Sequence, residues 1–318
     1  MGLIKNVMVL GPIVSQVDIF KASGNVGKPI VSALLRADFA VTVNSSVSSL
    51  SDNFFSNVAK VSVDYNSVPS LKEAFKGQDA IVEAFNPNVS VYQDKIAKAA
   101  VEAGVKHIIT PDFSSDTFNE NAKELLIFEP KQQAQRRLEE GTKNSGVSWT
   151  AIITGPFFDW AIPRGIFWVD PKTRTVTVFG SGNQKVSMSN IDIVGRATVA
   201  VLSKPDSFAN RPAYFADYNV TTNELSKILE EITKPNGWSV ALVPVATLFA
   251  DGKQKWQEDS AKNVQDRLNS AAYQMLGTYG IFEESNRYGA DFSDKIEKGW
   301  LRDLEHLKED LSQIVKED

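Results

Sequence analysis

A glycine-containing segment, ASGNVG at residues 22–27, has the composition and spacing of a phosphate-binding loop. Gly24 and Gly27 are three residues apart, and the apolar segment that follows them has helical spacing. Small residues at the start of a helix let the backbone approach a phosphate, and the unpaired N–H groups and the helix dipole attract it. The candidate residues for binding the pyrophosphate of a dinucleotide are Gly11, Ala22, Ser23, Gly24, Asn25, Val26 and Gly27.

Ten residues, Pro12–Lys21, lie between Gly11 and this segment. Without them the loop would read GASGNVG, with a glycine at every third position. Either NVMVLG (residues 6–11) is the preceding strand and Pro12–Lys21 bulges outward, or QVDIFKA (residues 16–22) is the strand instead. We favour the first arrangement, because the second would bury Asp18 in a parallel sheet without a partner. A further alternative is that the insertion impairs cofactor binding.

Around this loop the chain alternates between short apolar segments and segments of helical periodicity, which is typical of βαβ units. We therefore predict an α/β protein with a Rossmann-type, doubly wound parallel sheet in residues 1–155. Residues 156–318 are predicted to form a smaller C-terminal α+β part that binds the substrate and is partly interleaved with the first domain. The predicted strands of the sheet lie within 6–11, 39–43, 59–65, 79–85, 106–113 and 148–158.

Polar and aromatic residues follow several of these strands, and ligands bind at the carboxyl ends of the strands in such folds. For the aromatic residues, ordinary core packing is an equal alternative, and the polar residues after the second strand are equally well explained as a surface loop. The candidate cofactor-binding residues at these ends are Asn44, Ser45, Asn86, Pro87, Phe113, Pro156, Phe157 and Phe158.

The composition excludes several classes of function. The net charge of −5 argues against direct contact with a nucleic-acid backbone, which calls for a basic face. The chain has no cysteine and two histidines, so we expect neither a disulfide nor a metal site, and a cytoplasmic location fits. No apolar run approaches the roughly 20 residues of a membrane helix.

The order of the segments resembles the NmrA-like and isoflavone-reductase-like family of atypical short-chain dehydrogenases, and its fungal members most. The likeness covers residues 5–205 and includes ASGNVGKPIVSALL, DYNSVPSLKEAFKGQDAIVEAF, KIAKAAVEAGVKHIITPDFSSDT and KQQAQRRLEEGTKNSGVSWTAIITGPFFD. The resemblance implies that the domain binds NADP(H) in preference to NAD(H). It also implies hydride transfer to a small aromatic or phenylpropanoid-type molecule. Other members of the family are redox-sensing regulators without catalysis, and such a role would involve a protein partner.

The sequence departs from the usual short-chain dehydrogenase pattern, in which a tyrosine stands four residues before a lysine. Position 127 is Ile, whereas Lys131 remains directly after Pro130 and matches the lysine that isoflavone-reductase-like enzymes use near the nicotinamide. The resemblance therefore implies a catalytic and cofactor-orienting role for Lys131, since a desolvated lysine loses its proton more easily. The alternative is a solvated lysine in the first turn of a helix. We predict an NAD(P)H-dependent oxidoreductase, with a non-catalytic NADP-binding sensor as the rival function.

Overall fold

The computed structural model describes residues 2–11, 25–44, 58–85, 91–166, 168–233, 237–264, 267–268 and 270–316. The chain forms two compact units, and each is assembled from three segments. Unit 1 comprises Met1–Phe113, Pro130–Ile153 and Asp192–Ala213, and unit 2 comprises Ser114–Glu129, Thr154–Ile191 and Tyr214–Asp318. The segments of the two units therefore alternate along the sequence, and no single cut in the sequence separates the units.

Unit 1 is built around a seven-stranded sheet with the strand order β10-β6-β5-β4-β1-β2-β3. The pairs β3–β2, β2–β1, β1–β4 and β4–β5 are parallel. In chain order its elements are β1 (Asn6–Leu10), α1 (Gly27–Arg36), β2 (Ala40–Asn44), β3 (Ala59–Val61), α2 (Val68–Phe75), β4 (Ala80–Glu83), α3 (Gln93–Ala103), β5 (His107–Ser114), α4 (Glu129–Thr142), β6 (Ser148–Ile153), α6 (Ile193–Ser203), α7 (Pro205–Phe208) and β10 (Arg211–Tyr214).

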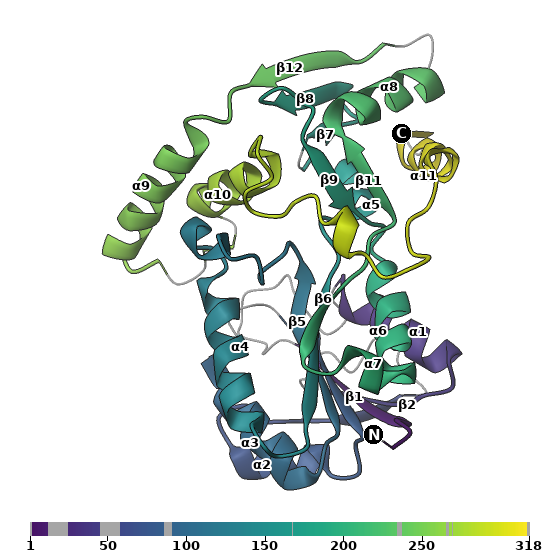
Figure 1. Ribbon diagram of the computed structural model, residues 1–318, viewed down its shortest axis with the longest axis vertical. Coiled ribbons are helices and arrows are strands. Elements are labelled where there is room, and N and C mark those ends of the chain that lie inside the picture. Colours follow the sequence, from purple (N-terminus) through teal and green to yellow (C-terminus); the bar gives the residue numbers. More distant parts are fainter. Residues whose placement is uncertain are drawn as a thin grey trace. The chain divides into compact units, whose positions relative to one another are not determined.

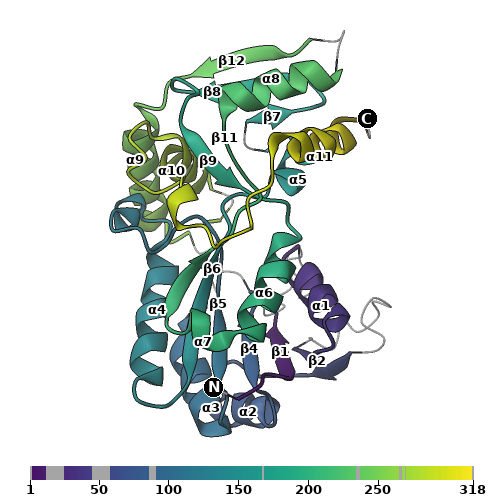
Figure 2. The ribbon, with the colours of Figure 1, turned by 45° about the vertical axis from the view of Figure 1, so that its right-hand side comes forward.

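The central strands are buried along nearly their whole length because helices cover both faces of the sheet. In Figure 2, α1 and α6 lie on one face, and α2, α3 and α4 lie on the other. α1 and α6 pack closely at Gly195, where a side chain would overlap with the carbonyl of Pro29 and with Ala33. The order of strands reverses beside β1, which is the doubly wound arrangement that the sequence predicts.

The local signals explain where the helices begin and end. Ser67 caps α2 by accepting a hydrogen bond from the Ser70 N–H, and α3 ends at Gly104, whose left-handed backbone suits glycine. Asp192 occupies the cap position of α6, although its side chain makes no capping bond within the described part of the chain.

The structure decides between the two arrangements of the N-terminal strand. β1 is the segment NVMVL, and it pairs with β2 on one side and β4 on the other at the centre of the sheet. The prediction that NVMVLG precedes the glycine loop is therefore confirmed. The insertion Pro12–Lys21 itself lies outside the described residues.

Unit 2 contains a three-stranded sheet with the order β12-β8-β7, a two-stranded sheet of β11 and β9, and several helices (Figure 1). Its apolar core includes Trp168, Val176, Tyr218 and Phe282. Its elements are η4 (Ala122–Leu125), α5 (Phe158–Ala161), η5 (Ile162–Arg164), β7 (Val169–Asp170), β8 (Thr175–Phe179), β9 (Lys185–Met188), β11 (Tyr218–Thr221), α8 (Thr222–Thr233), β12 (Ser239–Val243), α9 (Leu248–Ala261), α10 (Ala271–Phe282), η6 (Ser293–Lys295) and α11 (Leu304–Lys316).

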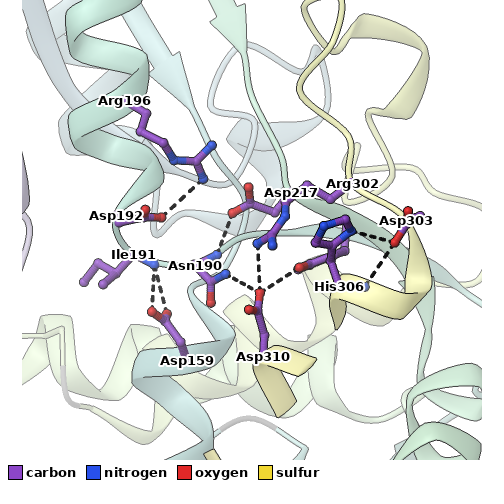
Figure 3. Close-up of polar contacts among 11 residues, drawn as sticks. Asp159, Asn190, Ile191, Asp192, Arg196, Asp217, Arg302, Asp303, His306 and Asp310 are labelled. Carbon is purple, nitrogen blue, oxygen red and sulfur yellow. Dashed lines mark hydrogen bonds and ion pairs between the residues drawn. The ribbon is translucent and has the colours of Figure 1, made fainter. Parts of the chain in front are cut away.

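A polar cluster fixes the C-terminal helix α11 within unit 2 (Figure 3). Asp310 accepts hydrogen bonds from Asn190 Nδ2 and Tyr218 OH, both at 2.6 Å, and from Arg302 Nη1 at 3.0 Å. Asp217 accepts from the Asn190 N–H at 2.9 Å. Because one carboxylate oxygen of Asp310 receives three donors, the cluster is well partnered, and we interpret it as an anchor of the fold.

Candidate functional site

The carboxyl ends of three neighbouring segments of unit 1 are joined by a short hydrogen-bonded chain. Asn44, the last residue of β2, donates from Nδ2 to the Tyr65 hydroxyl at 3.0 Å. The Tyr65 hydroxyl donates in turn to the carbonyl oxygen of Gly11 at 2.6 Å. All three residues are buried, and burial raises the pKa of Tyr65, so its hydroxyl remains a donor at neutral pH. These two hydrogen bonds fix the position of Gly11, the residue at which the glycine loop begins.

The start of α1 has the properties expected of a phosphate-binding helix terminus. Gly27 is its first residue, and Val26 occupies the cap position without a side-chain hydrogen bond. No acidic residue lies in the first turn of α1. The N–H groups and the positive end of the dipole are therefore not neutralised by a side chain of this helix.

The described part of the chain includes some of the predicted cofactor-binding residues and not others. Asn25 is exposed in the turn before α1, Val26 is partly buried, and Gly27 is buried. The side chain of Asn44 donates a hydrogen bond to Tyr65, and its predicted role in cofactor binding stays a prediction. The predicted residues Ala22, Ser23, Gly24, Ser45, Asn86 and Pro87 lie outside the described residues.

Lys131 lies in the first turn of α4 and points to the carboxyl end of β5. Its Nζ donates to the carbonyl oxygen of Asp112 at 2.6 Å. The Asp112 carboxylate accepts from the Thr110 hydroxyl at 2.7 Å. Burial lowers the pKa of the Lys131 amine, and the nearby Asp112 charge opposes this shift only in part. The helix dipole also disfavours a cation in the first turn of a helix. Burial and the dipole therefore both disfavour the charged form of Lys131.

Glu83 is a further candidate site residue, which the sequence analysis did not name. It is the last residue of β4 and is fully buried. Gln93, the first residue of α3, donates from Nε2 to Glu83 Oε1 at 2.7 Å. Burial, assisted by the Asp112 charge, raises the pKa of Glu83 to about 8. The available signal was an acidic residue that ends an otherwise apolar strand, AIVE, because buried acids cluster at functional sites.

Phe113 has an unusual backbone. It is buried near the end of β5 with φ at +32°, a value that few bulky residues adopt. Such outliers persist where the surrounding structure holds them, often at functional sites. This geometry is compatible with the predicted role of Phe113 beside a cofactor, which stays a prediction.

The residues that follow β6 belong to unit 2. Pro156 and Phe157 are partly buried, whereas Phe158 is 2% exposed and packs edge-to-face on Tyr218 with ring centroids 5.7 Å apart. The Phe158 side chain therefore packs in the core of unit 2, which is the alternative that the sequence left open, and its place in a cofactor site stays a prediction. Gly155 has φ at +65°, and a side chain there would overlap with the Ser187 carbonyl, so only glycine fits.

Unit 2 contains a small, mostly apolar pocket of about 20 Å³ between η4, α10 and the segment after α10. Its polar side-chain groups are the hydroxyls of Ser115 and Tyr288, and the latter donates to Glu124 at 3.1 Å. Gly280 faces Leu125 so closely that a larger residue would clash with it. The pocket is lined by Ser115, Leu125, Phe128, Gly155, Pro156, Val186, Gly277, Gly280, Ile281, Tyr288, Gly289, Ala290 and Phe292.

The described residues form neither a metal-ligand cluster nor a helix suited to crossing a membrane. These residues include no cluster of three or more histidine or acidic side chains that could hold a metal ion. Within the same residues, no helix is both long enough and apolar enough to cross a membrane.

The strand order and the helices on both faces define a Rossmann-type α/β protein. A family model, that of the NmrA-like family, matches residues 14–310. The chain therefore belongs to the NmrA-like family.

Curated relatives and solved structures agree with this assignment. The chain is 30% identical to "Oxidoreductase poxI" of Penicillium oxalicum over 240 residues, which cover 74% of this chain and 76% of the relative. It is 31% identical to "Oxidoreductase aprR" of Aspergillus flavus over 226 residues, which cover 70% and 75%. The structure of AtPrR2 with NADP+ and (+)pinoresinol has a TM-score of 0.71 and 22% identity, covering 97% of this chain and 99% of the other. The structure of leucoanthocyanidin reductase of Vitis vinifera with NADPH has a TM-score of 0.73 and 17% identity, covering 98% of this chain and 99% of the other. At these identities the two structures establish the fold.

Proposed function

We propose that the protein is an NAD(P)H-dependent oxidoreductase of the isoflavone-reductase-like type, with NADP(H) as its preferred cofactor. The observation that carries this proposal is Lys131, whose amine lies at the carboxyl end of β5 with a lowered pKa. The relatives named as oxidoreductases and the structural neighbours that hold NADP+ or NADPH support it.

The residues of unit 1 fit a dinucleotide. The uncapped start of α1 suits a pyrophosphate, and the Asn44–Tyr65–Gly11 chain holds the preceding strand end in place. β2 ends in Asn44, and Ser45 follows, so no acidic residue stands at these positions to accept from a ribose 2′-hydroxyl. The arginine that usually pairs with the 2′-phosphate of NADP is absent from these positions as well, so the preference for NADP(H) is supported by the structural neighbours that hold NADP+ or NADPH.

When bound, a reduced nicotinamide supplies a hydride to the substrate. In this proposal the Lys131 ammonium supplies the matching proton and becomes a neutral amine. The lowered pKa makes this proton transfer easier, and the Asp112 carbonyl oxygen holds the amine in one position. Solvent protonates the amine again at the end of the cycle.

For the substrate, we infer a small aromatic or conjugated organic molecule that enters the apolar pocket of unit 2. Apolar and aromatic side chains with few polar groups are typical of sites for such molecules. The pocket of about 20 Å³ is smaller than an aromatic ring, so binding requires side chains on η4 or α10 to rotate. Leu125 and Ile281 are the flexible apolar side chains on these two elements that line the pocket.

The test has two stages. Calorimetric titration with NADPH and NADH measures cofactor binding, and absorbance at the nicotinamide band follows turnover with a panel of aromatic carbonyls and alkenes. Lys131→Met is expected to retain NADPH binding and lose at least about 100-fold in kcat, the scale of general acid catalysis. Lys143→Met, an exposed lysine just after α4, is the matched control and should behave like the unchanged protein.

The same experiment addresses the rival function. The absent tyrosine at position 127 and the neutral end of β2 are compatible with a sensor that binds NADP(H) without turnover. Tight NADPH binding, no turnover across the panel, and no effect of Lys131→Met would contradict the oxidoreductase and favour the sensor. If neither nucleotide binds, a chain without Pro12–Lys21 tests whether the insertion is the cause.

A further inference from the structure

A buried polar pair, Glu83 at the carboxyl end of β4 and Gln93 at the start of α3, has no part in the function proposed above. Glu83 is fully buried and Gln93 is 1% exposed, and a single hydrogen bond of 2.7 Å joins them. In the described structure, neither Glu83 Oε2 nor Gln93 Oε1 has a hydrogen-bond partner. An unsatisfied buried polar atom costs about 1–3 kcal/mol. Two of them in contacting residues therefore require an explanation.

A cavity of about 10 Å³ adjoins Gln93 within unit 1. Besides Gln93, a second residue with an unbonded buried oxygen, Gln135 of α4, lines this cavity. This volume is about what one water molecule needs, and buried waters make two to four hydrogen bonds to otherwise unsatisfied groups. The cavity is lined by Gln93, Thr110, Pro111, Asp112, Lys131, Ala134, Gln135 and Leu138.

Lys131 brings the complementary group to the same cavity. An ammonium has three N–H donors, and one of those on Lys131 goes to the Asp112 carbonyl oxygen. A water molecule in the cavity could accept a second donor from Lys131. Its two hydrogens could then go to Gln93 Oε1 and Gln135 Oε1, which would satisfy these two oxygens at once, whereas Glu83 Oε2 would keep no partner among the described residues.

We propose that this cavity binds one water molecule between the Lys131 amine and the amide oxygens of Gln93 and Gln135, and that Glu83 and Gln93 are positioning residues for Lys131. Glu83 accepts the Gln93 Nε2 hydrogen bond and so turns the amide oxygen away from itself, toward the cavity. The bound water gives the ammonium an acceptor inside the protein and thereby stabilises its charged form. The catalytic meaning of this arrangement rests on the proposed function, whereas the water site itself does not.

The charges that act on Lys131 come from a small number of elements. Asp112 of β5 raises the pKa of the lysine and also that of Glu83 on β4, so the three groups form one electrostatic cluster. α3 contributes the neutral Gln93, and α4 contributes the neutral Gln135 to the cavity wall. Gln93 is itself neutral, so a lower pKa of Lys131 after its removal reports the lost hydrogen bond together with any change in the ionisation of Glu83, whose pKa the Gln93 hydrogen bond lowers.

The test measures the protonation of Lys131 without any substrate. The full chain is labelled with trace acetic anhydride between pH 6 and 11, and mass spectrometry of digested protein gives the midpoint of labelling at Lys131. Gln93→Leu is expected to lower this midpoint by about one pH unit, because the charged form loses an acceptor. Glu83→Leu, which no longer orients the amide, should lower it as well, and Glu83→Gln, which keeps an acceptor, should lower it less.

A matched control uses Gln78→Leu. Gln78 also has a buried, unbonded Oε1, but it lies before β4, at the opposite end of the strand. Its replacement should leave the Lys131 midpoint unchanged. If Gln93→Leu does not fold, Gln135→Leu on the partly exposed side of α4 removes the other oxygen and should also lower the midpoint.

The outcomes separate this inference from the proposed function. A Lys131 midpoint that stays within about 0.2 pH units of wild type in Gln93→Leu and Gln135→Leu would overturn the water site, whatever the turnover. A lowered midpoint in these variants, together with turnover that does not depend on Lys131, would support the water site and overturn the proposed function. With both correct, the pH profile of kcat shifts in the same direction as the labelling midpoint.

Discussion

Two acidic residues at opposite ends of β4 have contrasting surroundings. Asp79, just before the strand, accepts from the backbone N–H groups of Lys5 and Asn6 at 2.9 Å each and from Lys106 Nζ at 2.6 Å. These partners hold its pKa below the ordinary value, although its partial burial acts in the opposite direction. Glu83, four residues later, has one neutral partner and a pKa raised to about 8.

The contrast shows that acidic groups at the two ends of the sheet have different roles: one stabilises the fold, and the other belongs to the proposed site. At the amino end, the ionised Asp79 is matched by three donors, so it contributes to stability. At the carboxyl end, a buried acid is kept with too few partners, at a cost to stability, beside the lysine proposed to act on substrate. Perturbed groups that stabilise nothing are candidates for function.

The largest expected effect is that of Glu83→Gln. The pKa of Glu83 is about 8 in the folded protein and has an ordinary value of 4.5, so wild-type stability falls as the pH rises from about 4.5 to 8. The difference corresponds to at most about 5 kcal/mol. Glu83→Gln, which cannot ionise, should therefore be more stable than wild type at pH 9 and differ little at pH 4.

Urea unfolding followed by circular dichroism at pH 4, 7 and 9 measures this difference. Glu140→Gln, at an exposed acid on α4, is the matched control and should show no such trend. An equal effect of Glu83→Gln at pH 4 and pH 9 would mean that Glu83 does not ionise over this range, and the contrast with Asp79 would fail.

A smaller effect is expected at the amino end of β5. His107 is fully buried between the hydroxyls of Ser148 (2.6 Å) and Thr150 (3.0 Å), and burial lowers its pKa to about 4. Because the unfolded chain binds this proton near pH 6.5, wild-type stability should fall by about 3 kcal/mol as the pH drops from 6.5 to 4. In His107→Gln this loss should shrink, whereas the exposed His306→Gln should retain it. Thermal unfolding between pH 4 and 7 tests both variants.

Asp79→Asn examines the well-partnered end directly. Because the pKa of Asp79 is lowered in the folded state, its contribution is present above the ordinary carboxyl pKa and is lost as the pH falls through the folded value. At pH 7 the variant should lose about 2 kcal/mol, since it weakens hydrogen bonds to a charged acceptor. The difference in urea midpoint between variant and wild type should be larger at pH 7 than at pH 3 for Asp79→Asn, and the exposed Asp294→Asn should show no difference from wild type at either pH. A loss of equal size at pH 3 would assign the effect to packing.

Much of unit 1 follows from the sequence, because its strands are continuous apolar runs bounded by clear caps. Ser67 begins α2 and Gly104 ends α3, and in each case the chemistry of that single residue explains the helix boundary. The site was harder to predict, because Glu83 and Gln93 are ten residues apart and only the packing of α3 on the sheet makes them partners. Lys131 was identified through the family resemblance. Its partner Asp112 could not be predicted, because the contact is made by the backbone carbonyl of β5 and not by the side chain.

Tyr65→Phe is expected to have the smallest effect, and it asks whether the carboxyl end also has purely structural hydrogen bonds. The change removes the donor to the Gly11 carbonyl at 2.6 Å and the acceptor for Asn44, so it should cost about 1 kcal/mol. Tyr92→Phe is a close control, because the Tyr92 ring lies 6.0 Å from that of Tyr65. If the hydrogen bonds of the Tyr65 hydroxyl order the start of the glycine loop, Tyr65→Phe should also weaken NADPH binding several-fold in calorimetry, whereas Tyr92→Phe should not. A loss of stability with unchanged NADPH affinity would show that the two functions of this sheet end, holding the fold and holding the cofactor, are separable.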